Sequence, residues 1–214
     1  MPFTTEQFFA VFVQYNEGVW PAQIFLNLLA LMEIALLCAG KQTADRMMAG
    51  ILAFLWTWMA IVYHFMFFAM INPAAWAFGM VFLLGAVWMF WIGVIKGQLH
   101  FEVSFGLRGI LGSILVIYAL LLYPLLGYLF GHAYPALPTF GLPCPTCIFT
   151  LGLLLFASVP VPRSLYIVPL IWVVVGSFAA FKLGVYQDYG LLLAGVIALM
   201  VVVPGQIRER MYRL

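Results

Sequence analysis

Residues 74–95 have the sequence AAWAFGMVFLLGAVWMFWIGVI, a run of 22 residues without a charged side chain. A helix that crosses a hydrocarbon core of about 30 Å needs about 20 mostly apolar residues, so this run is long enough for one crossing. The strands of a membrane β-barrel would instead alternate apolar and polar residues over segments of about ten residues. Because backbone N–H and C=O groups in lipid must be paired within the segment, the continuous run predicts an α-helix.

The rest of the chain has the same character. Of its 214 residues 66% are hydrophobic and 7% are charged, whereas an ordinary soluble domain is about a quarter charged. We therefore expect an all-α, polytopic membrane protein that forms a single domain with seven transmembrane helices. The predicted spans cover residues 18–39, 47–71, 74–95, 107–130, 145–160, 164–182 and 189–207.

A short amphipathic helix is expected before the first span. Thr4 and Gln7 have capping-box spacing, and Phe8 and Phe12 follow at helical spacing. Such a helix is typical of a segment lying in the membrane interface. Residues 1–17 contain no Lys or Arg, so the positive n-region of a cleavable signal peptide is missing and we expect the first span to be retained.

The positive charges alternate between the two sides of the predicted membrane. Short cytoplasmic loops retain Lys and Arg. These residues fall in every second loop and in the C-terminal tail, and the opposite side has only Lys182. We therefore expect the N-terminus outside and the C-terminus in the cytoplasm. The residues on the cytoplasmic side are Lys41, Arg46, Lys96, Arg108, Arg163, Arg208, Arg210 and Arg213.

Two cysteines, Cys144 and Cys147, mark the outer end of the fifth predicted span. This span is too short for a full crossing, so we expect longer neighbours to shield it, and we expect the Pro- and Gly-rich segment 131–143 before it to fold back into the bundle. A helix N-terminus stabilises a thiolate, and in a C-x-x-C unit one thiol can assist the other. Free cysteines are also common as small apolar core residues. Both interpretations stay open.

Several polar side chains are expected at the same outer depth. His64 lies within a span, where an ionisable residue is a functional candidate, although a neutral histidine bonded to a neighbouring helix would fit equally. Asp188 is also the simplest N-cap of the last helix. The candidate ligand-binding residues are Tyr15, Asn16, Glu17, His64, Asn72, His132 and Asp188.

A metal site is a further hypothesis for the same region. The two thiols with His132 or His64 would suit a soft metal ion such as zinc, copper(I) or mercury(II). The spacing from His132 to Cys144 matches no standard metal signature.

Four stretches, in this order, resemble an uncharacterised family of bacterial multi-pass inner-membrane proteins, a domain of unknown function. The resemblance implies a bacterial inner (cytoplasmic) membrane location and supplies no activity or catalytic residues. The family pattern continues CPT with threonine more readily than with cysteine, which weakens the case for Cys147. The stretches are PFTTEQFFAVFVQYNEGVWPAQ at 2–23, YHFMFFAMINPAAWAFG at 63–79, GHAYPALPTFGLPCPTCIFTLGLLL at 131–155 and GVYQDYGLLLAG at 184–195.

The sequence is compatible with three functions. The leading hypothesis is a non-enzymatic protein that binds or transports a small solute or soft metal ion through an outward-facing polar cavity. The alternative is a membrane thiol-disulfide oxidoreductase using Cys144 and Cys147, with or without a quinone. The C-x-x-C unit resembles that of membrane quinone reductases, but those enzymes use two cysteine pairs on one side, and Cys38 lies at the other end. A third is a structural subunit or homo-oligomer, suggested by small-residue faces around Gly112 and Gly176. The expected partners are membrane lipids, a small solute or ion, and a second copy or another subunit of a complex; nothing in the sequence suggests nucleic acid.

Overall fold

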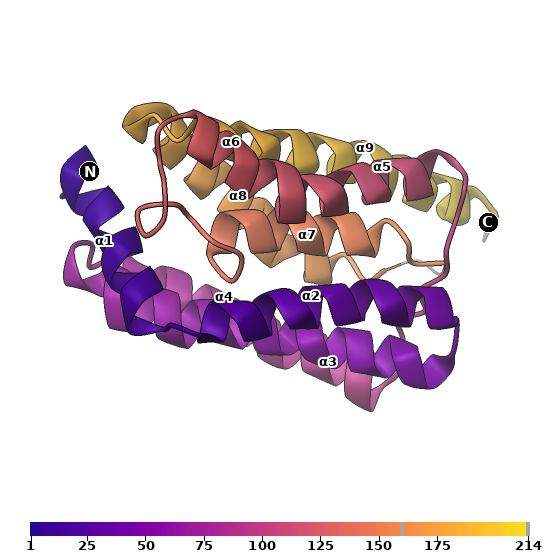
Figure 1. Cartoon of the computed structure of the whole chain (residues 1–214). Helices are drawn as coiled ribbons and strands as arrows, with labels where there is room; N and C mark the ends of the chain where they lie inside the picture. The colour runs from indigo at the N-terminus through magenta and orange to yellow at the C-terminus, as the bar shows by residue number, and fades with distance from the viewer. Residues whose placement is uncertain (159–160, 213–214) are drawn as a thin grey trace.

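Figure 1 shows the computed structural model, which describes the chain over residues 1–158 and 161–212 and its side chains as far as Val201. Within these residues the protein is all-helical, with no β-strand. Three of the segments, η1, η3 and η4, are π-helical, and η2 and η5 are short 3₁₀ turns. The elements are α1 Thr5–Gly18, α2 Ala22–Ala39, α3 Gln42–Trp58, η1 Met59–Phe67, η2 Phe68–Met70, α4 Ala75–Met89, η3 Phe90–Ile95, α5 Leu107–Ile117, η4 Tyr118–Leu122, α6 Tyr123–Leu129, α7 Pro143–Leu154, α8 Ser164–Leu183, η5 Tyr186–Asp188 and α9 Tyr189–Tyr212.

Five helical segments of the described chain are long and apolar enough to cross a membrane, not the seven that the sequence predicts. They correspond to the first, second, third, fourth and sixth predicted spans. In the last predicted span, the apolar helix that the structure describes covers Tyr186–Val201 and is shorter; the side chains of residues 202–207 lie outside the described part. The five segments are Ala22–Ala39, Gln42–Met70, Ala75–Ile95, Leu107–Leu129 and Ser164–Leu183.

The fifth predicted span, 145–160, is the 12-residue helix α7. At 1.5 Å per residue it is about 18 Å long, too short for a hydrocarbon core of about 30 Å. The helix ends before the expected proline boundary because the following residues pair with another loop. Phe156 accepts a backbone hydrogen bond from Glu102 at 3.0 Å, and Ser158 donates one to His100 at 2.9 Å. Residues 159–160 lie outside the described residues.

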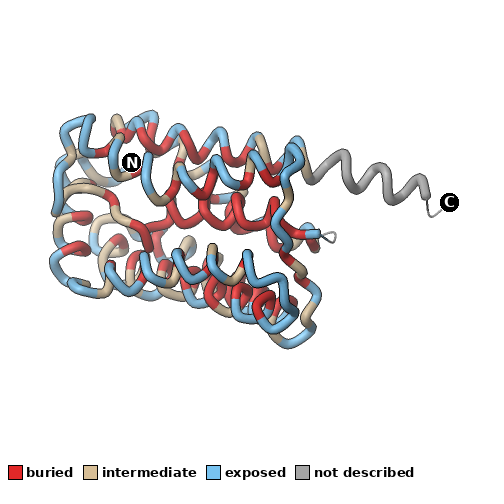
Figure 2. The backbone as a smooth tube through the Cα atoms, turned by 45° about the vertical axis from the view of Figure 1, so that its right-hand side comes forward, coloured by how far each residue is buried: buried red, intermediate tan, exposed pale blue. Residues whose placement is uncertain are grey.

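Helix α7 is the centre of the molecule. One layer of helices contains α2, α3 and α4, another contains α5, α6, α8 and α9, and α7 lies between them (Figure 1). It contacts α5, α8 and α9, and Trp56 of α3 donates a hydrogen bond to its Thr150 at 3.2 Å. Eleven of its 12 residues are buried, and only Cys144 is partly exposed. Figure 2 shows this buried core with exposed residues around it. Longer helices therefore shield the short one, as expected.

Small residues bring α7 and α8 close to their neighbours. A Cβ atom on Gly112 of α5 would lie 2.9 Å from the carbonyl oxygen of Gly152 in α7. A Cβ atom on Gly176 of α8 would lie 2.7 Å from the Leu191 side chain and 3.5 Å from the sulfur of Cys144. These two small-residue faces serve contacts within the chain, which removes the observation that suggested a subunit interface.

Helix α1 closes one end of the bundle. The predicted capping box is confirmed: Thr4 accepts a hydrogen bond from the Gln7 backbone, and the Gln7 side chain accepts one from the Thr4 backbone. Phe8, Phe12 and Tyr15 are buried in a second hydrophobic cluster with residues of η1, η2 and α8. The amphipathic helix thus packs its apolar face on protein.

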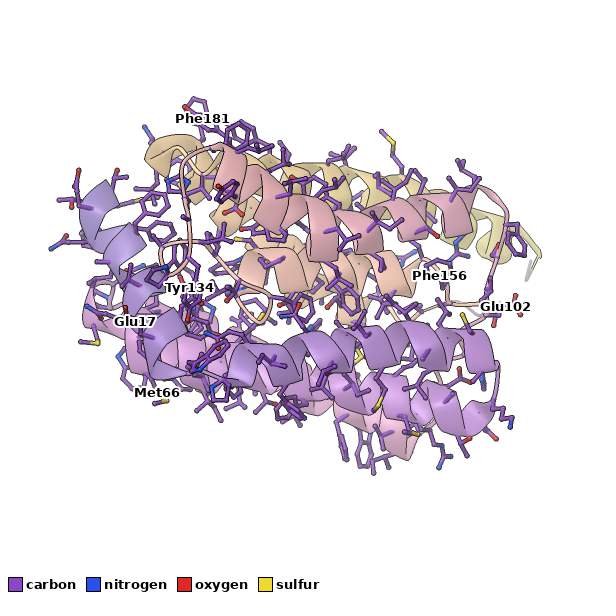
Figure 3. The ribbon with its side chains drawn as sticks, in the orientation of Figure 1. Glu17, Met66, Glu102, Tyr134, Phe156 and Phe181 are labelled. Atoms are coloured by element: carbon purple, nitrogen blue, oxygen red, sulfur yellow. The ribbon has the colours of Figure 1, made fainter. Side chains whose placement is uncertain are left out.

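The two ends of the bundle carry different loops. The N-terminus and the C-terminus lie at opposite ends (Figure 1). Figure 3 places Glu17 and Tyr134 at one end, called here the α1 end, and Glu102 and Phe156 at the other, called the Glu102 end. At the Glu102 end, Asp45 accepts a hydrogen bond from the Phe101 backbone at 2.9 Å and lies 3.0 Å from the ring nitrogen Nδ1 of His100.

Candidate functional site

A cavity of about 400 Å³ lies at the α1 end of the bundle. Its wall is formed by residues of α1, η1, η2, α4, α6, α7, α8 and η5, together with the chain before α1 and the loops after η2 and α6. The wall is mostly apolar, and among the described residues nine aromatic side chains contribute to it. Its polar groups come from separate elements. They are Tyr63, Asn72, Tyr123, Cys144, Trp172 and Asp188.

Asp188 is the acidic group of this wall and is only 4% exposed. Tyr123 donates a hydrogen bond to its Oδ1 atom, and the thiol of Cys144 lies beside the carboxyl group. No Lys or Arg in the described chain forms an ion pair with it. Asp188, which the sequence suggested as the N-cap of the last helix, therefore lies in the cavity wall.

The π-helical segment η4 explains how Asp188 is held. Tyr118 and Tyr123 are five residues apart, which in an α-helix of 3.6 residues per turn would separate them by about 140° around the axis. In the π-helical turn their rings lie 6.4 Å apart between centroids. Tyr118 donates to the carbonyl oxygen of Gln187 at 2.6 Å, and Tyr123 donates to Asp188. Both tyrosines therefore anchor η5, consistent with the frequent use of π-bulges at functional sites.

The two cysteines of α7 have different surroundings. Cys144 lines the cavity and accepts a hydrogen bond from the indole Nε1 of Trp172 at 3.4 Å. Cys147 is fully buried in the main core and does not line the cavity. Both thiols are free. The geometry therefore supports Cys144 as a site residue and gives no support to a working thiol pair.

His64 lies behind the cavity wall. Its side chain is fully buried, and neither ring nitrogen has a hydrogen-bond partner in the described part of the protein. The ring packs on Phe82 and on Trp172, with centroid separations of 5.3 and 5.1 Å. Since Trp172 lines the cavity and His64 does not, the histidine supports the wall. The hydrogen bond to a neighbouring helix that the sequence suggested is not formed.

Asn16 fastens a loop instead of facing the cavity. Its side chain is buried and donates to the carbonyl oxygens of Pro135 and Leu137 at 2.7 Å each. Its oxygen Oδ1 accepts a hydrogen bond from Thr139 at 2.8 Å. The predicted folding back of segment 131–143 is observed, and Asn16 holds it there.

The remaining candidates of the α1 end also lie outside the cavity wall. The hydroxyl of Tyr15 accepts a hydrogen bond from the Trp58 indole at 2.8 Å, and Glu17 is exposed. His132 stacks on Phe9 with ring centroids 4.1 Å apart, and partial burial lowers its pKa. Tyr15, Asn16, Glu17, His64 and His132, which the sequence suggested as ligand-binding residues, do not line this cavity.

A metal site finds no support in the geometry. In residues 1–158 and 161–201, no three His, Cys, Asp or Glu side chains come close enough together to hold a metal ion. Of the expected set, Cys144 faces the cavity, Cys147 lies in the core and His132 stacks on an aromatic ring. The hypothesis of a soft metal ligand set is not carried further.

Asn72, Cys144 and Asp188 are the sequence candidates that do line the cavity, and three polar contributors were missed. The missed side chains are Tyr63, Tyr123 and Trp172. A buried Tyr hydroxyl or Trp N–H within an apolar span usually finds a partner. That requirement is the signal that would have placed them near the outer polar residues.

The long apolar helices around a buried short one fit a membrane protein. The chain belongs to a family of unknown function, DUF6064, whose family model matches residues 5–213. The resemblance noted from the sequence is thereby confirmed at the level of the family; the bacterial source and the inner membrane stay predictions. No curated protein and no solved structure matches the chain.

Proposed function

We propose that the chain is a multi-pass protein of the bacterial inner membrane that binds a small, mostly apolar solute in the cavity at its α1 end. The proposed topology has seven crossings, with the α1 end outside. Two observations support it: the termini lie at opposite ends of the bundle, and positive residues fall in every second loop, as expected for cytoplasmic loops. In this topology the short helix α7 lies in the membrane surrounded by longer helices.

The cavity is the observation that carries the proposal. Small-molecule sites have volumes of about 300 to 1,000 Å³ and combine an apolar wall with a few placed polar groups. The cavity here has about 400 Å³, and its polar groups include Asp188, Tyr123 and Cys144. Since these three come from different elements and Tyr123 and Cys144 both lie beside Asp188, they form a preorganised polar patch. The apolar wall would hold the body of a solute, and the patch would orient it.

Access to the cavity is from the face of α8. Val174 and Phe178 both line the cavity and are 72% and 57% exposed. In a membrane this face meets lipid, where an apolar solute is concentrated. The proposed route of entry is therefore lateral, from the outer half of the bilayer.

Alkylation of Cys144 tests the proposal because its thiol lies in the cavity wall. The purified protein in detergent is treated with N-ethylmaleimide with and without tert-butylbenzene, a neutral apolar probe, and each cysteine is followed by mass spectrometry. We expect the probe to slow alkylation of Cys144 at least threefold. Cys38 is exposed and serves as the internal control, with an unchanged rate. A Cys144 that does not react, or that reacts equally fast with the probe, contradicts the proposal.

A further inference from the structure

The charge balance of the cavity points to the chemistry of the solute. Asp188 is a buried carboxyl group, and no Lys or Arg lines the cavity in the described chain. Lys182 is at the same end but is exposed, with its Nζ atom 5.9 Å from the ring centre of Phe178. It lines a separate surface hollow and not the cavity. Met1 also lines the cavity, but in the described chain neither its N-terminal amine nor any Lys or Arg forms an ion pair with Asp188.

The aromatic wall complements the carboxyl group. The side chains around the cavity belong to several elements, and Trp172 of α8 packs with Phe78 of α4 at a centroid separation of 5.7 Å. The face of an aromatic ring carries negative charge density, so a cation within about 6 Å of a ring is attracted to it. Aromatic rings around a carboxyl group form the environment that recognises organic ammonium groups. The aromatic residues of this wall include Phe8, Phe12, Tyr63, Phe78, Trp172 and Phe178.

We infer that the solute of the proposed function is a lipophilic organic cation, an amine or quaternary ammonium compound whose positive group pairs with Asp188 and whose apolar body packs on the aromatic wall. An anionic solute would place like charges together in an apolar space. A neutral solute would offer the carboxyl group no counter-charge, whereas a cation would stabilise its ionised form. A bare metal ion lacks ligands, because no three His, Cys, Asp or Glu side chains meet in the described part.

The test compares two compounds of the same shape. Phenyltrimethylammonium and tert-butylbenzene differ at one atom, a positively charged nitrogen in place of a carbon. Protection of Cys144 from N-ethylmaleimide is measured for each over a range of concentrations, again with Cys38 as internal control. In the wild-type protein we expect the cation to protect at a concentration at least tenfold lower than its neutral isostere. In Asp188→Asn this preference disappears, and in Asp188→Glu, which keeps the charge, it is retained.

The outcomes separate this inference from the proposed function on which it rests. If tert-butylbenzene protects as well as phenyltrimethylammonium in the wild type, the solute class is wrong and the cavity remains a binding site. A preference that persists in Asp188→Asn also overturns the inference. If neither compound protects Cys144, the proposed function itself fails. Cys147 is fully buried in the folded protein, so its alkylation shows that a variant has unfolded. If a variant unfolds, the comparison of the two compounds in the wild-type protein tests the inference.

Discussion

Asn16 joins segments that are far apart in the sequence, since three hydrogen-bond partners of its side chain lie 119 to 123 residues away. Replacing it by Ala leaves two partly buried carbonyl groups and a hydroxyl without this partner. Each unsatisfied group costs about 1 to 3 kcal/mol, so we expect Asn16→Ala to lower the free energy of unfolding by about 2 to 4 kcal/mol. Denaturant unfolding in detergent measures the change.

Asn27→Ala is the matched control for this substitution. The Asn27 side chain is exposed and bonds only to the backbone of its own helix, at Gln23. We expect its removal to cost less than about 0.5 kcal/mol, as is usual for surface substitutions. Equal effects of the two substitutions would show that Asn16 does not hold the loop.

The same residue shows the limit of prediction at this scale. A polar side chain near the outer face of a membrane protein has the same sequence signature whether it binds a solute or a backbone carbonyl. Asn16 was expected to bind a ligand and bonds to the loop before α7, whereas Asp188 was expected as a candidate and does line the cavity. The difference depends on contacts across the bundle, which sequence spacing does not specify.

The contact between α5 and α7 leaves no room for a side chain at Gly112. A Cβ atom on Gly112 would lie 2.9 Å from the backbone oxygen of Gly152 and 2.7 Å from the ring of Phe156. Because backbone cannot move aside cheaply, we expect Gly112→Ala to lower the melting temperature despite the helix preference of Ala. The cost should be roughly 1 to 3 kcal/mol, as for overpacked cores. Differential scanning fluorimetry of the detergent-solubilised protein measures it.

Gly50→Ala is the control within another apolar helix. At Gly50 the nearest side-chain atom would lie 3.7 Å from the new Cβ atom, an ordinary contact. Ala is favoured over Gly in helices by about 1 kcal/mol, so this variant should be at least as stable as the wild type. A Gly112→Ala protein that melts as high as Gly50→Ala would refute the close packing of α5 and α7.

Features of the helices that depend on residues close in the sequence were predicted correctly, whereas features that depend on distant contacts were not. The capping box at Thr4 and Gln7 was predictable because its partners are three residues apart. The π-helical turn at η4 lets both Tyr118 and Tyr123 bond to η5. A search for apolar residues at the α-helical period of 3.6 residues does not detect such a turn. The end of α7 depends on pairing with residues 100–102, so the sequence placed it too late.

For the whole molecule, hydrophobic length alone identified the five long helices, because span length is fixed by the bilayer. The short length of the fifth predicted span also predicted that longer neighbours shield it, but it could not show which helices do so. Only some of the residues that line the cavity were predicted. Depth along a span can be counted from the sequence, but the direction of each side chain around the bundle depends on packing.

The proposed orientation makes a prediction about the two ends of the bundle. Glu17 and Glu102 are exposed at opposite ends (Figure 3). In a background lacking Cys38 and Cys144, we expect Glu17→Cys to react with a membrane-impermeant maleimide on intact bacterial cells. Glu102→Cys should react only after the membrane is permeabilised. The reverse pattern would mean that the orientation is inverted, and labelling of both on intact cells would exclude a membrane between the two ends.

The central claim is that the cavity beside Asp188 takes up a small apolar solute. Crystals of the protein soaked in bromobenzene test this directly, because anomalous scattering locates bromine without reference to the protein map. The account predicts a bromine peak inside the cavity, against its aromatic wall and within van der Waals reach of Cys144. Bromine peaks confined to the outer, lipid-facing surface, with none in the cavity, would contradict it.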